Sequence, residues 1–246
     1  RRLEANAAVL QCSPEGDDPA DAPSFQVQGT RWTVGSLLAH LSRTGTMPSQ
    51  YLSWAVSRKD CFDLRGVTNP AQALFPSIDE VLNLMVLLVC ERGFNLSVMN
   101  ALTVDSFPAS DPDIEGPVHT VGVDKPRRGT RRYSNEILAG EAGKLWENAV
   151  RLTEPCRTAL AALRTPSEKL LIAHRHKNLT DEGPFRQEWL TAGIGDHYMS
   201  DAGLLADDGT PLRVSLRRLR LSEQVLNQHA RQNSESVSED TYRSPD

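Results

Sequence analysis

The stretch PSIDEVLNLMVLLVCERGFNLSVMNAL, residues 76–102, contains the strongest structural signals in this chain. Ser77 stands three residues before Glu80, which is the pattern of a capping box at the start of a helix. The residues from Ile78 to Glu91 are apolar almost all round, and this predicts a helix at the centre of the core. Gly93 is expected to stop that helix, and a second short helix follows directly.

Further helices are predicted on both sides of this stretch, together with a short extended region. Apolar residues repeat at helical spacing from Thr30 onward. His119 to Val123 alternates like a strand, and Arg131 to Ser134 is its expected antiparallel partner. This order predicts a mainly helical α+β domain with a small antiparallel hairpin or sheet. The other expected helices are Tyr51–Val56, Leu96–Leu102, Glu136–Val150, Glu154–Leu163, Gly183–Trp189 and Leu216–Gln228.

Composition places this chain of 246 residues among globular proteins, with 39% hydrophobic and 24% charged residues. Residues 1–28 are rich in Gly, Pro, Asp and Ala and lack periodicity, so a flexible acidic tail or linker is predicted there. Residues 29–75 are expected to form a helical N-terminal portion. Residues 76–246 are expected to form the main domain.

Basic side chains are concentrated in two places, although the net charge of the chain is −5. Five of the eight residues from Lys125 to Arg132 are basic, and so are four of the eight from Arg213 to Arg220. Local clusters, rather than net charge, meet phosphate groups, so both are candidates for DNA contacts. The alternatives are a solvated hairpin at the first cluster and ion pairs with Glu223 and other acids at the second.

The cysteines and the apolar runs predict a cytoplasmic protein. Four cysteines lie far apart without a C-x-x-C pair, which argues against a disulfide framework and against a zinc site. Cys90 falls in the most apolar run, where a reduced thiol in the core is expected. That run, Val81–Cys90, is shorter than a membrane span, and we see no signal-peptide pattern, so no membrane partner is expected.

No metal or nucleotide cofactor is predicted. His174 and His176 form an H-x-H pair, but no third ligand at matching spacing accompanies them, so a surface or structural role is expected. Asp111, Asp113 and the neighbouring acids lack the spacing of a calcium loop. The sequence contains no G-x-G-x-x-G, P-loop or G-x-S-x-G motif.

The turn from Arg92 to Leu102 resembles part of the catalytic domain of tyrosine recombinases, the phage-integrase family. That family has a glycine turn after a buried helix, an arginine two residues past the glycine, and a short helix ending in Ala-Leu. A hairpin carrying a lysine, an H-x-x-R segment, a second histidine or tryptophan, and a tyrosine nine residues further on complete its pattern. The likeness covers roughly residues 76–246 and implies a helical catalytic domain with a small antiparallel sheet.

The resemblance implies phosphate-binding and proton-donating residues in this chain. Lys125, beside the predicted hairpin, matches the lysine that in the family protonates the departing 5′ oxygen. The segment RRLR at residues 217–220 matches H-x-x-R, with Arg220 as the family arginine. Positions three apart share one face of a helix, so both outer guanidinium groups could reach one phosphate. Arg217 as the family arginine is a second possible register.

The nucleophile and the first arginine decide between two hypotheses. Tyr242 matches the tyrosine that forms a covalent 3′-phosphotyrosine link without a metal or external energy source, and Asn233 lies nine residues before it. Asn95 occupies the place of the first arginine, and losing such a charged donor commonly costs about 10²–10³ in rate. The first hypothesis is a site-specific recombinase or integrase of impaired activity. The second is a catalytically inactive DNA-binding or regulatory relative on the same fold. A frayed tail residue is the other explanation of Tyr242.

Double-stranded DNA is the expected partner under both hypotheses. Self-association on paired DNA sites is implied by the resemblance alone. A third hypothesis is a helical interaction domain that never touches DNA, and binding that weakens steeply with salt would count against it. The side chains expected to hold the DNA backbone are Arg127, Arg128, Arg131, Arg132, Arg213, Arg218 and Arg231.

Overall fold

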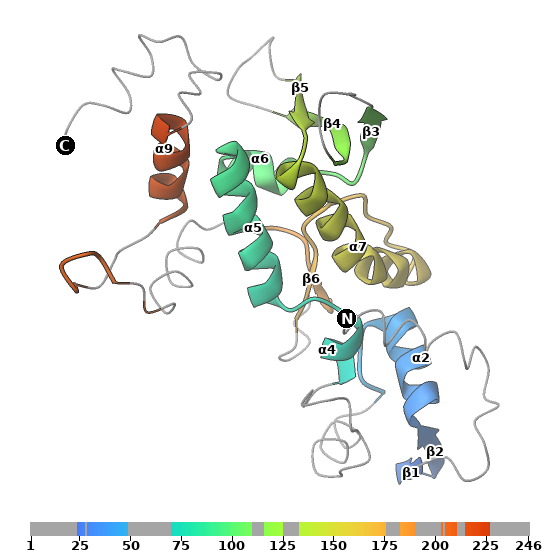
Figure 1. Ribbon diagram of the computed structural model, residues 1–246. Coiled ribbons are helices and arrows are strands. Elements are labelled where there is room, and N and C mark those ends of the chain that lie inside the picture. The colour runs from blue at the N-terminus through green and yellow to red at the C-terminus, as the bar shows by residue number, and fades with distance from the viewer. Residues whose placement is uncertain are drawn as a thin grey trace. The chain divides into compact units, whose positions relative to one another are not determined.

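The computed structural model shows a mixture of helices and small antiparallel sheets (Figure 1). It describes residues 24–27, 29–48, 70–109, 116–124, 133–175, 183–189, 203, 205–210 and 215–226. Within these residues there are six helices and three sheets. The predicted α+β class is therefore confirmed, with more strands than the single expected hairpin.

Two compact units divide the chain, and each combines segments that are distant in the sequence. Unit 1 comprises Arg1–Val81 and Ala149–Gln187, and unit 2 comprises Leu82–Asn148 and Glu188–Asp246. This division differs from the predicted one, whose boundaries followed residues 28 and 75. Those boundaries came from local composition and periodicity, which do not report which distant segments pack together.

A hairpin opens the described part of unit 1. In it, β1 (Ser24–Val27) pairs antiparallel with β2 (Thr30–Thr33). The predicted tail is therefore wrong at residues 24–27, and the predicted helix start at Thr30 is wrong as well. The physical reason is local, because Gly29 has a φ of 79° and lets the chain turn back between two short strands.

The helix α2 (Val34–Thr44) follows the hairpin directly, with Thr33 as its N-cap. The amide of Ser36 donates to the Thr33 hydroxyl at 3.1 Å, and the amide of Thr33 donates to the Ser36 hydroxyl at 2.9 Å. Gly45 ends the helix in the left-handed conformation, with a φ of 63°. The Thr33 cap explains why the helical pattern that begins near Thr30 becomes helix only from Val34, and Gly45 explains why the helix ends at Thr44.

The core of unit 1 forms around the apolar face of α2. Leu37, Leu38 and Leu41, which helical spacing predicted, are completely buried. Residues of α4 (Pro70–Leu74) and of the second half of α7 (Glu141–Ala162) complete this core. Its other buried members are Ala71, Leu74, Phe75, Cys156, Ala159, Leu160, Ile172 and Phe185.

A short antiparallel pair of strands joins this core. It consists of β6 (Ala173–His174) and β7 (Phe185–Arg186). The helix predicted for residues 183–189 is therefore wrong. Pairing with β6 and burial of Phe185, which is only 4% exposed, outweigh a weak helical pattern in this segment.

The helix α7 (Glu141–Ala162) is continuous over 22 residues. Two helices, Glu136–Val150 and Glu154–Leu163, were predicted where the structure has one, and Pro155 lies inside it. Proline has no amide proton to continue the hydrogen-bond ladder of a helix. The guanidinium of Arg157 reaches back across the proline and donates to the carbonyl of Val150 at 2.6 Å and to the hydroxyl of Thr153 at 2.7 Å. These bonds supply donors near the position where the proline withholds one.

The predicted capping box opens α5 (Ile78–Arg92). The amide of Ser77 donates to the carboxylate of Glu80 at 2.8 Å, and the amide of Glu80 donates to the hydroxyl of Ser77 at 3.2 Å. The helix is not buried all round, because Leu87 is 49% exposed and Cys90 is exposed. The expectation of a core thiol at Cys90 is therefore wrong, since a run of apolar residues does not reveal which face meets neighbours.

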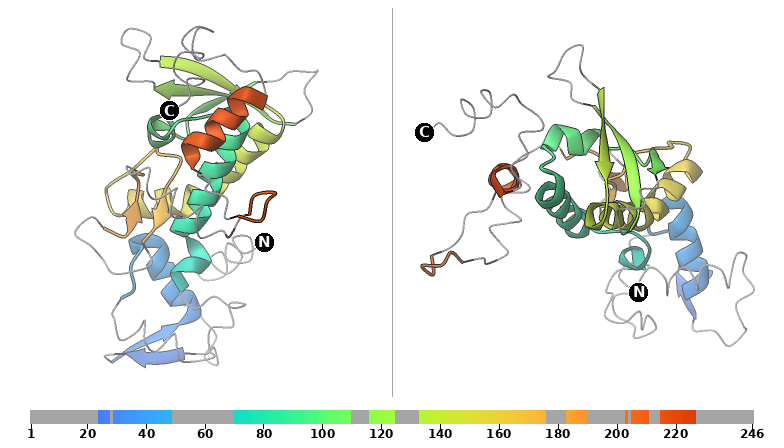
Figure 2. Two further views of the ribbon diagram at one scale, coloured as in Figure 1. Left: turned by 90° about the vertical axis from the view of Figure 1, so that its left-hand side faces the viewer. Right: turned by 45° about the horizontal axis from the view of Figure 1, so that its top comes forward.

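Unit 2 contains a three-stranded antiparallel sheet in the order β3-β4-β5 (Figure 2). Its strands are β3 (Ser106–Ala109), β4 (Val118–Asp124) and β5 (Tyr133–Leu138). The predicted antiparallel hairpin is confirmed by the pairing of β4 with β5. The predicted helix start at Glu136 is wrong, because this residue pairs within β5 and α7 begins after the strand ends.

Two further helices of unit 2 carry the candidate site. These are α6 (Leu96–Ala101) and α9 (Leu216–Leu226), both close to their predicted bounds. The carboxamide of Asn100 on α6 accepts a hydrogen bond from the amide of Trp189 at 2.7 Å and donates to its carbonyl at 3.1 Å. Trp189 is 1% exposed, so this pair of bonds attaches a buried anchor of the later chain to α6.

One described stretch, Ala71–Arg92, is long and apolar enough to cross a membrane by length and composition. At 22 residues it is longer than the apolar run Val81–Cys90 that lies within it. However, 56% of its most apolar window is buried inside the protein. A buried core helix meets the same criterion, so this stretch does not identify a membrane protein.

Candidate functional site

The turn at Gly93 positions the first part of the candidate site. The amide of Gly93 donates to the carbonyl of Val89 at 2.8 Å, and its φ of 60° ends α5 as predicted. Phe94 follows and is 1% exposed, which fixes the turn against the interior of unit 2. Asn95 comes next and starts α6 as its N-cap.

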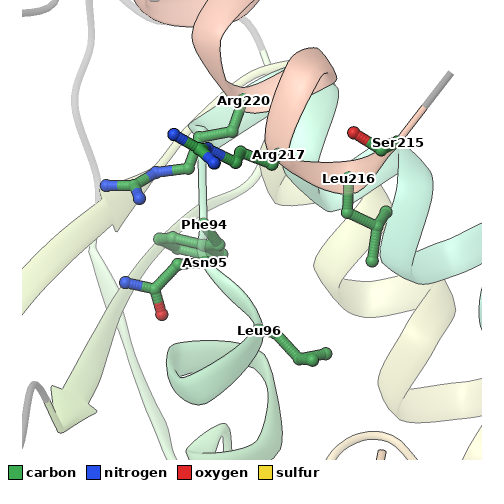
Figure 3. Close-up of a pocket in the computed structure, with 7 residues that line it drawn as sticks. All are labelled: Phe94, Asn95, Leu96, Ser215, Leu216, Arg217 and Arg220. Atoms are coloured by element: carbon green, nitrogen blue, oxygen red, sulfur yellow. The ribbon is translucent and has the colours of Figure 1, made fainter. Parts of the chain in front are cut away.

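The carboxamide of Asn95 has two different ends. Its oxygen Oδ1 accepts from the amide of Val98 at 2.9 Å and from the hydroxyl of Ser97 at 2.7 Å. Its nitrogen Nδ2 points away from α6 in Figure 3, and it donates no hydrogen bond to any residue that the structure describes. The cap therefore fixes the side chain of Asn95 through Oδ1, while the two protons on Nδ2 can donate hydrogen bonds to a ligand.

The arginines of α9 supply the second part of the site. The helix starts after Ser215, whose hydroxyl accepts from the amide of Arg218 at 3.2 Å. The Nε of Arg220 donates to the carbonyl of Gly93 at 2.8 Å, a bond between residues 127 positions apart. Arg217 is exposed, and among the described residues it makes no hydrogen bond or ion pair.

These two parts enclose a pocket of about 320 Å³ in unit 2. In Figure 3 the polar ends of Asn95, Arg217 and Arg220 lie toward the left of the view, and Leu96 and Leu216 lie toward the right. The pocket combines cationic and amide donors with an apolar wall. Its lining residues are Phe94, Asn95, Leu96, Ser215, Leu216, Arg217 and Arg220.

The electrostatics of the pocket favour an anion. Two guanidinium groups lie three residues apart on one helix, so they share a face. The pocket also includes residues 215 and 216 at the N-terminal end of α9, where the partial positive charge of the helix dipole is located. Arginine forks bind phosphate oxygens in pairs, and neither a guanidinium nor a carboxamide acts as an acid or base in catalysis near neutral pH. These side chains can bind a phosphate ester, and proton transfer requires other residues.

The structure brings together three of the predicted site residues, Asn95, Arg217 and Arg220. It places Arg218 on the exposed surface of α9, outside the lining of the pocket. The remaining predicted residues lie outside the part of the chain that the structure describes, and their roles stay predictions. These are Lys125, Arg127, Arg128, Arg131, Arg132, Arg213, Arg231, Asn233 and Tyr242.

The sequence indicated Glu223 only as a possible ion-pair partner of the nearby arginines, whereas the structure shows it 5% exposed and directly against Gly93. A β-carbon at position 93 would collide with its carboxylate oxygen. The spacing of Glu223, three residues after Arg220 on a predicted helix, was visible in the sequence, but its burial was not. The apolar wall formed by Leu96 and Leu216 was also missed, because these residues are ordinary at helix starts.

His119 has partners that the sequence did not reveal. Its Nε2 lies 3.1 Å from a carboxylate oxygen of Glu147, and its Nδ1 lies 3.3 Å from the hydroxyl of Ser106. The three residues connect β3, β4 and α7 within unit 2. They lie outside the lining of the pocket described above.

His174 has the structural role that was one of the two expectations for the H-x-H pair. Its Nε2 lies 2.6 Å from the carbonyl of Gly45, and its ring stacks on Phe75 with 5.2 Å between ring centroids. Burial lowers the pKa of His174, although the hydrogen bond with Gly45 acts in the opposite direction. Among the described residues, no cluster of three His, Cys, Asp or Glu side chains could hold a metal ion.

Comparison with known proteins adds no relative. No protein-family model, no curated protein and no solved structure matches this chain. The geometry of the pocket and the order of the sequence motifs therefore remain as the indications of function.

Proposed function

We propose that this chain is a DNA-binding protein with a tyrosine-recombinase-like fold, which holds a backbone phosphate of double-stranded DNA in the Gly93 pocket. In this proposal Tyr242 cleaves and rejoins the DNA, copies of the chain assemble on paired DNA sites, and the protein acts in the cytoplasm. The single observation that carries the proposal is the meeting of Asn95, Arg217 and Arg220 in one pocket. Asn95 is more than 120 positions from the two arginines. The resemblance to tyrosine recombinases implies that these segments lie close together.

The proposed reaction is a transesterification at phosphorus. The phenol of Tyr242 releases its proton to water as its oxygen attacks the phosphodiester, a bond forms between that oxygen and phosphorus, and the bond to the 5′ oxygen breaks. Lys125 gives a proton to the departing 5′ oxygen. Arg217 and Arg220 hold the non-bridging oxygens while negative charge grows on them, and Asn233 assists by hydrogen bonding. Religation reverses these steps, so no cofactor is consumed.

A nicked suicide substrate tests the chemistry. The substrate is a pool of duplexes of randomised sequence with a nick near each candidate cleavage point, because phosphate contacts carry no sequence information. The full chain should form a covalent protein–DNA adduct that survives denaturation, and Tyr242→Phe should form none. An adduct of equal yield in Tyr242→Phe would exclude this tyrosine as the nucleophile.

A charge-matched pair of variants tests the pocket. Arg217→Ala should weaken binding of a fluorescent duplex by about tenfold. It should also reduce the slope of log affinity against log salt concentration by about one. Arg151→Ala is the control, because it removes one positive charge from an exposed position of α7 that does not line the pocket. Equal losses in the two variants would show that only overall charge matters, and the proposed phosphate site would be wrong.

A catalytically inactive DNA-binding or regulatory protein is the second candidate, and Asn95 favours it. The carboxamide of Asn95 is occupied as a helix cap and carries no charge to offer a transition state. This candidate predicts DNA binding that depends on Arg217, with no covalent adduct on any nicked substrate. Asn95→Arg sharpens the choice, since it should raise adduct formation only if the remaining catalytic residues function.

A further inference from the structure

We infer that Glu223 is a positioning residue of the pocket, which holds the Gly93 turn and the guanidinium of Arg220 in the geometry that receives a phosphate. The inference depends on the proposed function for the identity of the ligand. The arrangement of Glu223, Gly93 and Arg220 does not depend on it. Three observations on the described residues lead to this role.

The first observation is the burial of a carboxylate. Glu223 is 5% exposed, and among the described residues it is the only acidic side chain that is buried. Removing a carboxylate from water is costly unless charged or hydrogen-bonding groups surround it. A glutamate on an ordinary helix surface would remain in solvent. Glu223 is instead buried against the Gly93 turn.

The second observation is that Glu223 and Arg220 pack on the same glycine. A β-carbon at position 93 would collide with the Glu223 carboxylate and would lie 3.8 Å from Cγ of Arg220. The carbonyl of Gly93 meanwhile accepts the Nε proton of Arg220 at 2.8 Å. The turn is therefore enclosed by an acidic and a basic side chain from one face of α9.

The third observation concerns the charges along α9. Arg217 and Arg220 are like charges three residues apart on one helix face, and they repel each other without a ligand. Glu223 stands three residues after Arg220 and adds one negative charge on the same side. It thereby favours the half-buried position of Arg220 in the free protein, before an anion arrives.

This role predicts that removing the charge of Glu223 weakens phosphate binding, whereas simple charge repulsion predicts that it strengthens phosphate binding. If Glu223 acted only as a negative charge near the pocket, Glu223→Gln would bind phosphate more tightly. As a positioning residue, Glu223→Gln should bind a DNA duplex about tenfold more weakly, because Arg220 loses its fixed orientation. The substitution keeps the size and shape of the side chain, so packing against Gly93 is preserved.

The test combines two measurements on the full-length chain. Nitrogen-15 NMR of arginine side chains follows the Nε proton of Arg220 without DNA, assigned by its disappearance in Arg220→Lys. We expect slow exchange of this proton in the parent protein and fast exchange in Glu223→Gln. Affinity for a fluorescent duplex is measured in parent, Glu223→Gln, Arg220→Ala and the double variant, with thermal unfolding recorded for each.

The outcomes separate positioning from a general structural role. In the Arg220→Ala background, Glu223→Gln should have no further effect on affinity, whereas a general loss of structure would lower affinity in both backgrounds. An unchanged Nε signal in Glu223→Gln, or tighter DNA binding, overturns the inference. If the Nε signal responds as expected but the parent protein binds no DNA, the inference holds and the proposed function fails.

Discussion

The two units each contain a left-handed glycine after a helix, and the chemistry around the two glycines is opposite. In unit 1, the carbonyl of Gly45 accepts a hydrogen bond from His174, and a β-carbon there would lie 2.7 Å from the ring of Phe185. In unit 2, the carbonyl of Gly93 accepts from Arg220, and a β-carbon would meet the carboxylate of Glu223. The same backbone arrangement is thus used twice.

The difference lies in the side chains that approach each turn. Around Gly45 they are aromatic and buried, and the histidine ring stacks on Phe75. Around Gly93 they are charged, and a pocket with two arginines opens beside them. A glycine turn with a distant hydrogen-bond donor is therefore not a functional signal by itself. The charge of the donor and an adjacent cavity distinguish a candidate site from a core contact.

The largest expected effect is on the Gly45 turn. Gly45→Ala combines a strained left-handed backbone, about 1–2 kcal/mol, with overpacking against a rigid ring, about 1–3 kcal/mol. We expect a loss of about 2–5 kcal/mol in the free energy of unfolding, measured by urea denaturation. DNA affinity of the folded fraction should not change. A loss below about 0.5 kcal/mol would mean that the turn adapts easily.

A smaller loss of stability is expected for Gly93→Ala. The backbone strain is the same, but the carboxylate of Glu223 can swing aside where the Phe185 ring cannot, so about 1–2 kcal/mol should be lost. DNA affinity should fall sharply, because both contacts that orient Arg220 are disturbed. Retained affinity together with lost stability would make the two turns equivalent and would remove the functional distinction between them.

A pH dependence is expected from the histidine at the Gly45 turn. Burial lowers the pKa of His174, so below the ordinary value of about 6.5 the unfolded chain takes up a proton that the folded chain refuses. The free energy of unfolding should therefore fall as the pH drops through 6.5 toward the lowered pKa. His174→Gln should flatten this slope in urea titrations, leaving the part due to His40, whose pKa is lowered by burial and by Arg43.

The smallest effect on stability is expected at the helix cap beside Gly93. Asn95→Asp keeps a capping oxygen for Val98 and adds a negative charge at the start of α6, so stability should change by less than about 0.5 kcal/mol. DNA affinity should fall, because the Nδ2 protons are lost and the new charge repels phosphate. Unchanged affinity would show that Asn95 is only a cap.

The sequence predicted features that depend on neighbours along the chain. The capping box of Ser77 and Glu80, the stop at Gly93 and the apolar face of α2 all arise from residues within one or two turns. The proximity of Asn95 and Arg220 was implied by the family resemblance, through the order of its motifs. Their roles in DNA binding stay predictions.

Features that depend on distant residues were not predictable in this way. Nothing near Glu223 in the sequence indicates that it is buried, because its contact is with a glycine 130 positions earlier. Similarly, strand β7 forms because β6 pairs with it, and its own sequence favoured a helix. Exposure of Cys90 depends on which neighbours cover α5, and an apolar run does not report that.

The hydrogen bonds that Arg157 makes across Pro155 in α7 have a consequence for sequence variation at these two positions. One terminal guanidinium nitrogen donates to the carbonyl of Val150 and the other donates to the hydroxyl of Thr153. Both acceptors lie in the turn of helix before Pro155, where the proline removes a backbone hydrogen bond. A lysine carries its donors on a single nitrogen and could not span both acceptors equally well. Positions 155 and 157 should therefore covary among descendants of this gene, with arginine dispensable wherever the proline has been replaced.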